Sequence, residues 1–282
     1  GFIIGPALGG TLSNWPLITG RAVALGLSRY AVPALAALGL SILNFVGVAL
    51  WLPESLTVAQ RRKLAGRKRT LLPLDTIRKA LDRPRVGVLL QTRFFYRLAF
   101  TMFTASFALY TSYRFGMSDQ TTSYILTYVG VVVVFVQGFL VGWLSSRFSE
   151  RRIILAGAVV LAAALLAWAV VPSVPMMLGV LAFLPLSGGT LNTVTNSALT
   201  KAVREEDIGG TLGLSTSLDS LTQILSPVIG GFLIGELGAW SVGAAGAIVM
   251  AGVVIYAGRR LVAKSTEYWD APAECAEAPE TA

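Results

Sequence analysis

Apolar runs of about 20 residues recur along almost the whole chain, and each is long enough to cross a bilayer as a helix. Inside a bilayer no water satisfies the backbone, so only helices and closed barrels are stable there. Of the 282 residues, 54% are hydrophobic and 13% are charged, whereas an average soluble domain is about 25% charged. We therefore predict an all-α polytopic membrane protein.

The apolar runs define the expected helices. They are a partial helix at 1–13 and complete spans at 31–52, 87–112, 122–145, 153–172, 175–199, 210–235 and 239–258. The first segment is too short to cross a bilayer, so we expect the chain to begin inside a helix.

Basic residues gather on one side of these spans. Ten Lys and Arg lie from Arg61 to Arg85, against two Asp. The other loops and the tail expected on that side hold Arg147, Arg151, Arg152, Lys201, Arg204, Arg259, Arg260 and Lys264. The opposite loops hold only Arg21, Arg29 and Arg114. By the positive-inside rule, we expect a cytoplasmic central loop and C-terminus in a multi-pass protein of the cell membrane, with no nucleic-acid partner.

The basic loop divides the chain. We expect the end of an N-terminal bundle at 1–54, a cytoplasmic linker at 55–86, a six-helix bundle at 87–260 and a polar cytoplasmic tail at 261–282. Leu74, Ile77 and Leu81 fall on one helical face, which predicts an interfacial helix within the linker. Residues 55–72 fit an ordinary flexible linker equally well.

A short motif occurs twice. Pro6, Gly9, Gly10 and Leu12 recur as Pro227, Gly230, Gly231 and Leu233, at a constant offset of 221. Such duplication is typical of membrane transporters. The offset corresponds to a unit of six helices, so we expect four helices and most of a fifth to precede Gly1 in a twelve-helix parent.

Three motifs carry a family resemblance. The pattern G-x3-G-P-x2-G-G is matched by Gly1, Gly5, Pro6, Gly9 and Gly10, and Leu52-Pro53-Glu54-Ser55 enters the basic loop. The pattern G-x-x-x-D-R-x-G-R-R is matched in part by Gly142, Arg147 and Arg151, with Arg152 extending it, while Ser146, Ser149 and Glu150 replace the acid, the glycine and an arginine. With six plus six helices, the chain resembles the drug:proton antiporter branch of the major facilitator superfamily, similar to tetracycline-efflux and multidrug-efflux proteins.

The resemblance implies a major-facilitator-type bundle with a complete C-terminal six-helix half and the last two helices of the N-terminal half. It also implies proton-coupled efflux of small organic, drug-like molecules by alternating access, around a cavity lined by the seventh, eighth, tenth and eleventh helices. Gly1, Gly5 and Gly9 share one helix face, where another backbone can approach closely. In the family, the loop that carries the second pattern holds the two halves together through charge pairs. Ser146 replaces the acid of that pattern, which puts this role in doubt for the present chain.

Polar residues within the spans are candidate site residues. A charge at mid-membrane costs about 2.5–3.5 kcal/mol on insertion scales. The candidates for the cavity or for coupling are Arg93, Arg97, Thr101, Gln137, Asn192, Asn196, Asp219 and Gln223. We expect Asp219 to pair with Arg93 or Arg97, as a counter-ion or as a proton-coupling site. Alternatively, Arg93 snorkels to the headgroups, and a packing hydrogen bond explains Gln137.

The chain lacks histidine, and its single cysteine, Cys275, lies in the tail. This excludes Cys/His metal sites and a His-dependent triad, so we expect neither an enzyme nor a cofactor. The expected partners are a small-molecule substrate, protons, the lipid bilayer and the missing N-terminal half. Two alternatives stay open, namely uptake or facilitated diffusion of a metabolite or organic anion, and an inactive truncated fragment.

Overall fold

The computed structural model describes residues 83–262 and most of residues 4–51, with gaps at 14, 16–19, 21–22, 25, 27 and 29–30. Its elements are α1 (Ile4–Leu12), α3 (Ala31–Trp51), α6 (Pro84–Phe115), α7 (Asp119–Phe135), the π-helical turn η1 (Val136–Leu140), α8 (Val141–Arg147), α9 (Glu150–Ala169), α10 (Val174–Lys201), α11 (Glu205–Leu237), α12 (Trp240–Ala257) and the π-helical turn η2 (Gly258–Val262). Within these ranges there is no strand, which confirms the all-α class.

Among the described residues, six helical segments are long and apolar enough to cross a membrane. They are Ala31–Trp51, Asp119–Arg147, Glu150–Ala169, Val174–Lys201, Asp207–Leu237 and Trp240–Leu261. The expected span at 87–112 is also a helix, α6, but it is less apolar because it carries four arginines. Gly1, the interfacial helix expected within the linker, and the tail after residue 262 lie outside the described residues.

Capping chemistry extends several helices beyond their apolar runs. α6 begins at Pro84 instead of residue 87, because the fixed φ of proline suits the first helical turn. It ends at Phe115, and the φ of 61° at the cap residue Gly116 turns the chain so that the N–H of Met117 reaches the carbonyl of Thr111 at 3.3 Å. α7 begins at Asp119 after the N-cap Ser118, which accepts a hydrogen bond from the backbone of Thr121 at 3.3 Å.

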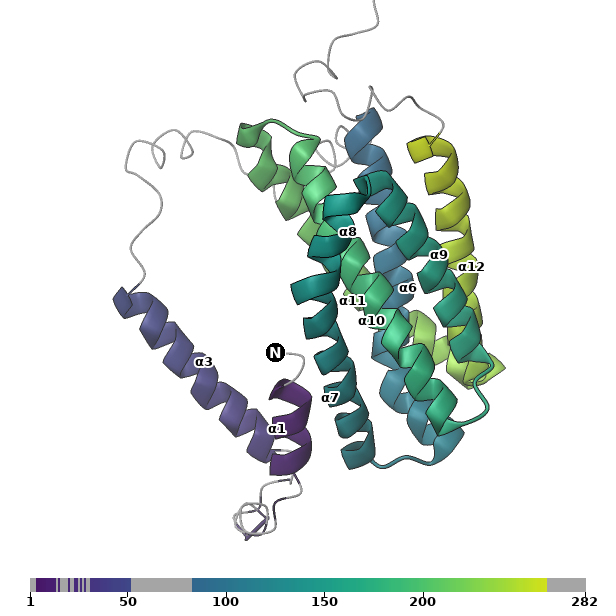
Figure 1. The fold of residues 1–282 in the computed structure, drawn as a ribbon. Coiled ribbons are helices and arrows are strands. Elements are labelled where there is room, and N and C mark those ends of the chain that lie inside the picture. The colour runs from purple at the N-terminus through teal and green to yellow at the C-terminus, as the bar shows by residue number, and fades with distance from the viewer. Residues whose placement is uncertain are drawn as a thin grey trace, which may run out of the picture.

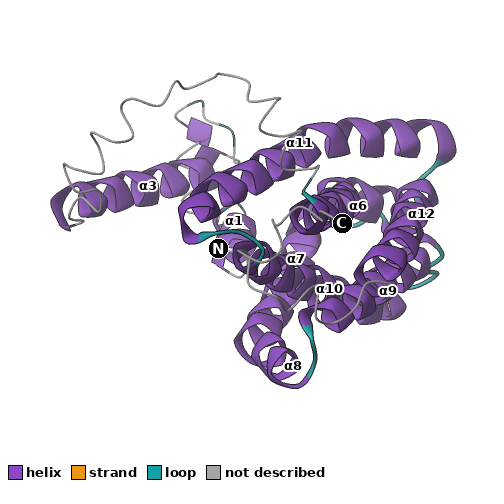
Figure 2. Cartoon of the chain, turned by 90° about the horizontal axis from the view of Figure 1, so that it is seen from above, coloured by secondary structure: helices purple, strands orange, loops and turns teal. Residues whose placement is uncertain are grey.

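The helices from α6 onwards form one bundle (Figures 1 and 2). α6 packs between α11 and α12, and α9 packs against α10 and α12. In the core, the ring of Trp168 lies edge-on to Phe103 at 5.0 Å, and its carbonyl accepts a hydrogen bond from the hydroxyl of Tyr110 at 3.1 Å. α7 also packs against α1, and α1 lies between α7 and α3 (Figure 1).

The repeated motif packs differently in its two copies. A Cβ at Gly10 would lie 2.8 Å from the Cβ of Ser123, so α1 approaches α7 closely there. In α11 it is Gly230 that lies against Ser106 of α6. Gly5 and Gly9 meet no described atom within 4 Å, so no described helix packs on their face, and the close approach expected there stays a prediction. Successive helical residues point in directions about 100° apart. Gly10, next to Gly9 in the sequence, therefore lies on a different face of α1, and this is the face that contacts α7.

Candidate functional site

A cavity of about 580 Å³ lies between α6, α7, α10 and α11. Its polar lining consists of Arg97, Thr101, Thr104, Gln137, Asn192 and Gln223. Its apolar lining includes Phe100, Phe103 and Phe107 from α6. These helices occupy the four spans for which the resemblance implied a cavity.

A buried ion pair joins α6 to α11 beside this cavity. Arg93 binds both carboxylate oxygens of Asp219, with Nη2–Oδ2 at 2.7 Å and Nε–Oδ1 at 3.2 Å. Its Nη1 donates to the amide oxygen of Asn196 on α10 at 2.9 Å. The Arg93 side chain is 5% exposed, so it does not snorkel to the headgroups, and that alternative is wrong. The expected pairing of Asp219 with an arginine of α6 is confirmed.

Arg97 completes the cluster one turn further along α6. Its Nε lies 3.4 Å from Oδ1 of Asp219, and its side chain is 23% exposed. Unlike the side chain of Arg93, that of Arg97 forms no hydrogen bond with a described residue, and it lines the cavity. One carboxylate therefore faces two guanidiniums that differ in their surroundings.

The neighbouring contacts hold α6 close to α10 and α11. A Cβ at Gly188 of α10 would lie 2.7 Å from the ring of Phe100, so these two helices are in close contact. Ser226 of α11 donates to the carbonyl of Leu98 at 3.4 Å. The small residues at these crossings fix the helices that carry the cluster.

The other polar residues expected at the site divide between the cluster and the cavity. Asn196 joins the cluster, whereas Thr101, Gln137, Asn192 and Gln223 line the cavity. The phenylalanines of the cavity are not among the residues predicted from the sequence, although their spacing along the helix of Arg97 places them close to one face. Phe103 and Phe107 pack edge to face with 5.7 Å between ring centroids.

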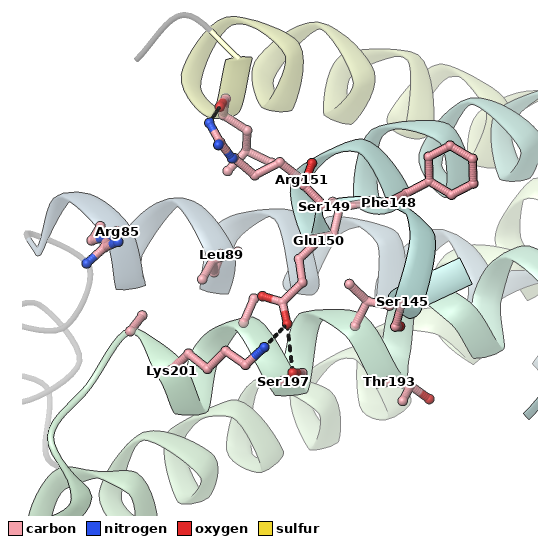
Figure 3. Close-up of a pocket in the computed structure, with 15 residues that line it drawn as sticks. Arg85, Leu89, Ser145, Phe148, Ser149, Glu150, Arg151, Thr193, Ser197 and Lys201 are labelled. Atoms are coloured by element: carbon pink, nitrogen blue, oxygen red, sulfur yellow. Dashed lines mark hydrogen bonds and ion pairs between the residues drawn. The ribbon is translucent and has the colours of Figure 1, made fainter. Parts of the chain in front are cut away.

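A second cavity, of about 680 Å³, lies where α9 begins (Figure 3). Glu150 points from α9 towards α10, where its Oε1 accepts hydrogen bonds from Ser197 at 2.8 Å and Lys201 at 2.7 Å. Next to it, Arg151 donates to the carbonyl of Leu261 at 3.4 Å. Glu150 stands where the family pattern has an arginine. The acid of this ion pair therefore lies on α9 and the base, Lys201, on α10, and both helices belong to the bundle that begins with α6.

The loop expected at 146–152, between two spans, is shorter in the structure. α8 extends to Arg147, which lies over the ring of Trp143 at 5.0 Å, and α9 begins at Glu150. An acidic residue in the first turn favours that helix start.

No described group of three His, Cys, Asp or Glu could hold a metal ion. The site is thus an apolar cavity with one buried charge cluster at its side. Such a site can bind a small molecule through apolar contact and a few polar groups.

Residues 89–276 match the family model of the Major Facilitator Superfamily. The chain belongs to this superfamily. It is therefore an integral multi-pass membrane protein and not an enzyme. Its major-facilitator-type fold is also confirmed by solved structures. One is a bacterial homologue of the human lysosomal transporter Spinster, with a TM-score of 0.57, 15% identity, 93% of this chain and 65% of that chain covered. Another is the POT family transporter PepTSo, with a TM-score of 0.52, 14% identity and coverages of 63% and 38%.

Other major facilitator proteins show sequence similarity. Solute carrier family 22 member 18 of Mus musculus is 31% identical over 83% of this chain and 55% of its own length. Tetracycline resistance protein, class G, of Vibrio anguillarum is 27% identical over 91% of this chain and 60% of its own length. The chain thus spans little more than half the length of these relatives.

Proposed function

We propose that this chain takes part in proton-coupled efflux of small organic, drug-like molecules by alternating access. The observation that carries the proposal is the cavity between α6, α7, α10 and α11, with the cluster of Arg93, Arg97 and Asp219 at its side. Buried charges within a membrane are costly and usually serve function. An apolar cavity with a few polar groups suits a small organic solute.

Two further observations support efflux and coupling. A similar protein is named for tetracycline resistance, which suggests a drug-like substrate. The motif around Gly5, Pro6 and Gly10 matches the pattern of the drug:proton antiporter branch. We assign Asp219 the role of counter-ion, because both its oxygens bind Arg93.

We also propose how the chain is divided and oriented. Residues 1–54 would belong to one bundle and 87–260 to another, with the basic linker 55–86 and the tail on the cytoplasmic side of the cell membrane. The contact of Gly10 with Ser123 would then lie at the surface where the two bundles slide. Arg147, Arg151 and Arg152 would anchor the cytoplasmic end of the second bundle.

Transport by reconstituted protein tests the proposal. Proteoliposomes containing the chain are given a pH gradient and a panel of anionic, neutral and cationic fluorescent solutes. We expect movement of at least one solute against its concentration gradient, and its collapse on adding a protonophore. Movement that persists without the gradient would instead indicate facilitated diffusion. If no solute moves, transport by this chain is refuted, as expected for an inactive fragment.

A matched pair of variants tests the sliding contact. Gly10→Ala places a methyl group 2.8 Å from the Cβ of Ser123, so we expect slower transport. Gly5→Ala adds the same methyl group where no described atom lies within 4 Å, so we expect little change. Equal rates for the two variants would show that the α1–α7 contact does not matter for transport.

A further inference from the structure

The charge cluster beside the cavity is not neutral. It contains the guanidiniums of Arg93 and Arg97 but only one carboxylate, that of Asp219. Among the residues described as lining the cavity there is no acid. One positive charge therefore remains uncompensated next to an apolar space, where electrostatic interactions are much stronger than in water.

The uncompensated charge belongs to Arg97. Arg93 uses Nε and Nη2 on Asp219 and Nη1 on Asn196, so its donors point away from the cavity lining. The Nε of Arg97 is turned towards Asp219, 3.4 Å from Oδ1, whereas its side chain is 23% exposed and lines the cavity. No hydrogen bond joins its Nη groups to a described residue, so they can donate to a ligand, and an anionic acceptor would bind them most strongly.

Three carboxamides line the same space. Gln137 comes from η1, Asn192 from α10 and Gln223 from α11. No side-chain hydrogen bond joins any of them to another described residue. Their N–H groups are thus available to a ligand, and together with Arg97 they form a set of donors for a carboxylate.

The part of the cavity lining that α6 contributes beyond Arg97 is largely apolar. Phe100, Phe103 and Phe107 line the cavity beyond Arg97 and provide apolar and aromatic surface. A ligand that fits both parts carries an anionic group at one end and an apolar ring at the other. A cation is disfavoured, because Asp219 already has both oxygens bound by Arg93.

We propose that this cavity selects organic anions, and that Arg97 is the residue that binds their anionic group. The proposal rests on the proposed function for transport and adds the charge class of the substrate. Arg93 is, in contrast, a positioning residue that neutralises Asp219 and fixes α11 against α6.

Equilibrium binding tests this selectivity without a proton gradient. The purified chain in lipid nanodiscs is titrated calorimetrically with 1-naphthoate, 1-naphthamide and 1-naphthylmethylammonium, and binding to empty nanodiscs is subtracted. These probes share one ring system and differ in charge. We expect naphthoate to bind at least about tenfold more tightly than the other two, because a charge-assisted hydrogen bond is roughly twice as strong as a neutral one.

Variants on α6 identify the residue. Arg97→Gln is expected to remove the preference for naphthoate, and Arg97→Lys to retain part of it. The matched control is Arg114→Gln on the same helix, since Arg114 donates to the carbonyl of Val171 at 3.4 Å and does not line the cavity. This control is expected to bind like the wild type, and size-exclusion chromatography shows whether each variant is folded.

Several outcomes would overturn the inference. They are tightest binding of the ammonium, equal binding of the three probes, no binding by the folded wild type, or an unchanged preference in folded Arg97→Gln. If Arg97→Gln does not fold, loss of the preference in Arg97→Lys overturns it equally. Proton-driven solute transport without anion preference would refute this inference alone. Selective binding without gradient-driven transport would refute the proposed function and leave the anion site standing.

Discussion

Two of the acid–base clusters that connect helices in the described part of the chain differ in their exposure to water. At mid-helix, Asp219 and Arg93 have side chains that are 14% and 5% exposed. Where α9 begins, Glu150 and Lys201 have side chains that are 28% and 70% exposed. Both pairs are 2.7 Å apart. Equal distances therefore conceal very different energies, because a buried pair that loses one partner leaves an unsolvated charge.

The difference also concerns hydrogen bonds. Arg93 forms three with side chains of α10 and α11, so the buried cluster joins three helices at one point. Glu150 accepts its two hydrogen bonds on a single oxygen and joins only α9 to α10. The buried cluster is thus the stronger constraint on helix arrangement, whereas water can replace the partners of the exposed one.

The largest effect is expected for Asp219→Asn. The variant leaves two guanidiniums without their carboxylate, and breaking a buried ion pair typically costs about 3–5 kcal/mol. The free energy of unfolding, measured by detergent denaturation in mixed micelles, should fall by that amount. The control is Ser220→Ala, whose exposed hydroxyl bonds only the backbone of Thr216 in its own helix. Equal losses in the two variants would show that the buried cluster does not stabilise the fold.

The two arginines of α6 should differ in the same assay. Arg93→Gln removes all three hydrogen bonds of the cluster, whereas Arg97→Gln leaves the bidentate pair intact. Because hydrogen bonds to charged groups contribute about 1.5–3 kcal/mol each, we expect Arg93→Gln to lose at least about 1.5 kcal/mol more. A larger loss for Arg97→Gln would contradict the assignment of Arg93 as the structural partner.

A smaller, salt-dependent effect is expected for Glu150→Gln. Exposed pairs are worth about 0.2–1 kcal/mol, and the charge of Glu150 also interacts with the start of α9. The loss relative to the wild type should shrink between 0.05 and about 1 M NaCl, since salt screens exposed charges. The loss in Asp219→Asn should hardly change with salt. Parallel salt dependence in both variants would contradict the difference in exposure.

The sequence predicted the buried cluster better than the exposed one, for a physical reason. A charge within an apolar run is conspicuous, and the rise of a helix, about 1.5 Å per residue, places Arg93, Arg97 and Asp219 at similar depth in their spans. It could not say which arginine would bind Asp219 in a bidentate manner, because that depends on the rotation of α11 against α6.

Predictions from sequence patterns also failed where tertiary contacts or helix capping determine the structure. The motif around Ser146 and Glu150 predicts a loop with an impaired charge pair, but the chain is helical up to Arg147 and again from Glu150. The partner of Glu150, Lys201, lies 51 residues away at the end of α10. Both residues lie at helix ends, where charged residues are common, so the sequence does not single out this pair as it does a charge inside an apolar run. The contact of Gly10 was missed in the same way, since spacing alone favoured the face of Gly5 and Gly9.

The smallest effect is expected for Lys201→Gln, and it decides whether the exposed pair exists as an interaction at all. The side chain of Lys201 is 70% exposed, so losing its charge should cost no more than about 0.5 kcal/mol. In a double-mutant cycle with Glu150→Gln, the coupling isolates the ion pair from the interaction of Glu150 with the helix start. A coupling energy above about 1 kcal/mol would show that the Glu150–Lys201 pair is stronger than an exposed ion pair should be. The two clusters would then differ in their position along the helices and not in their strength.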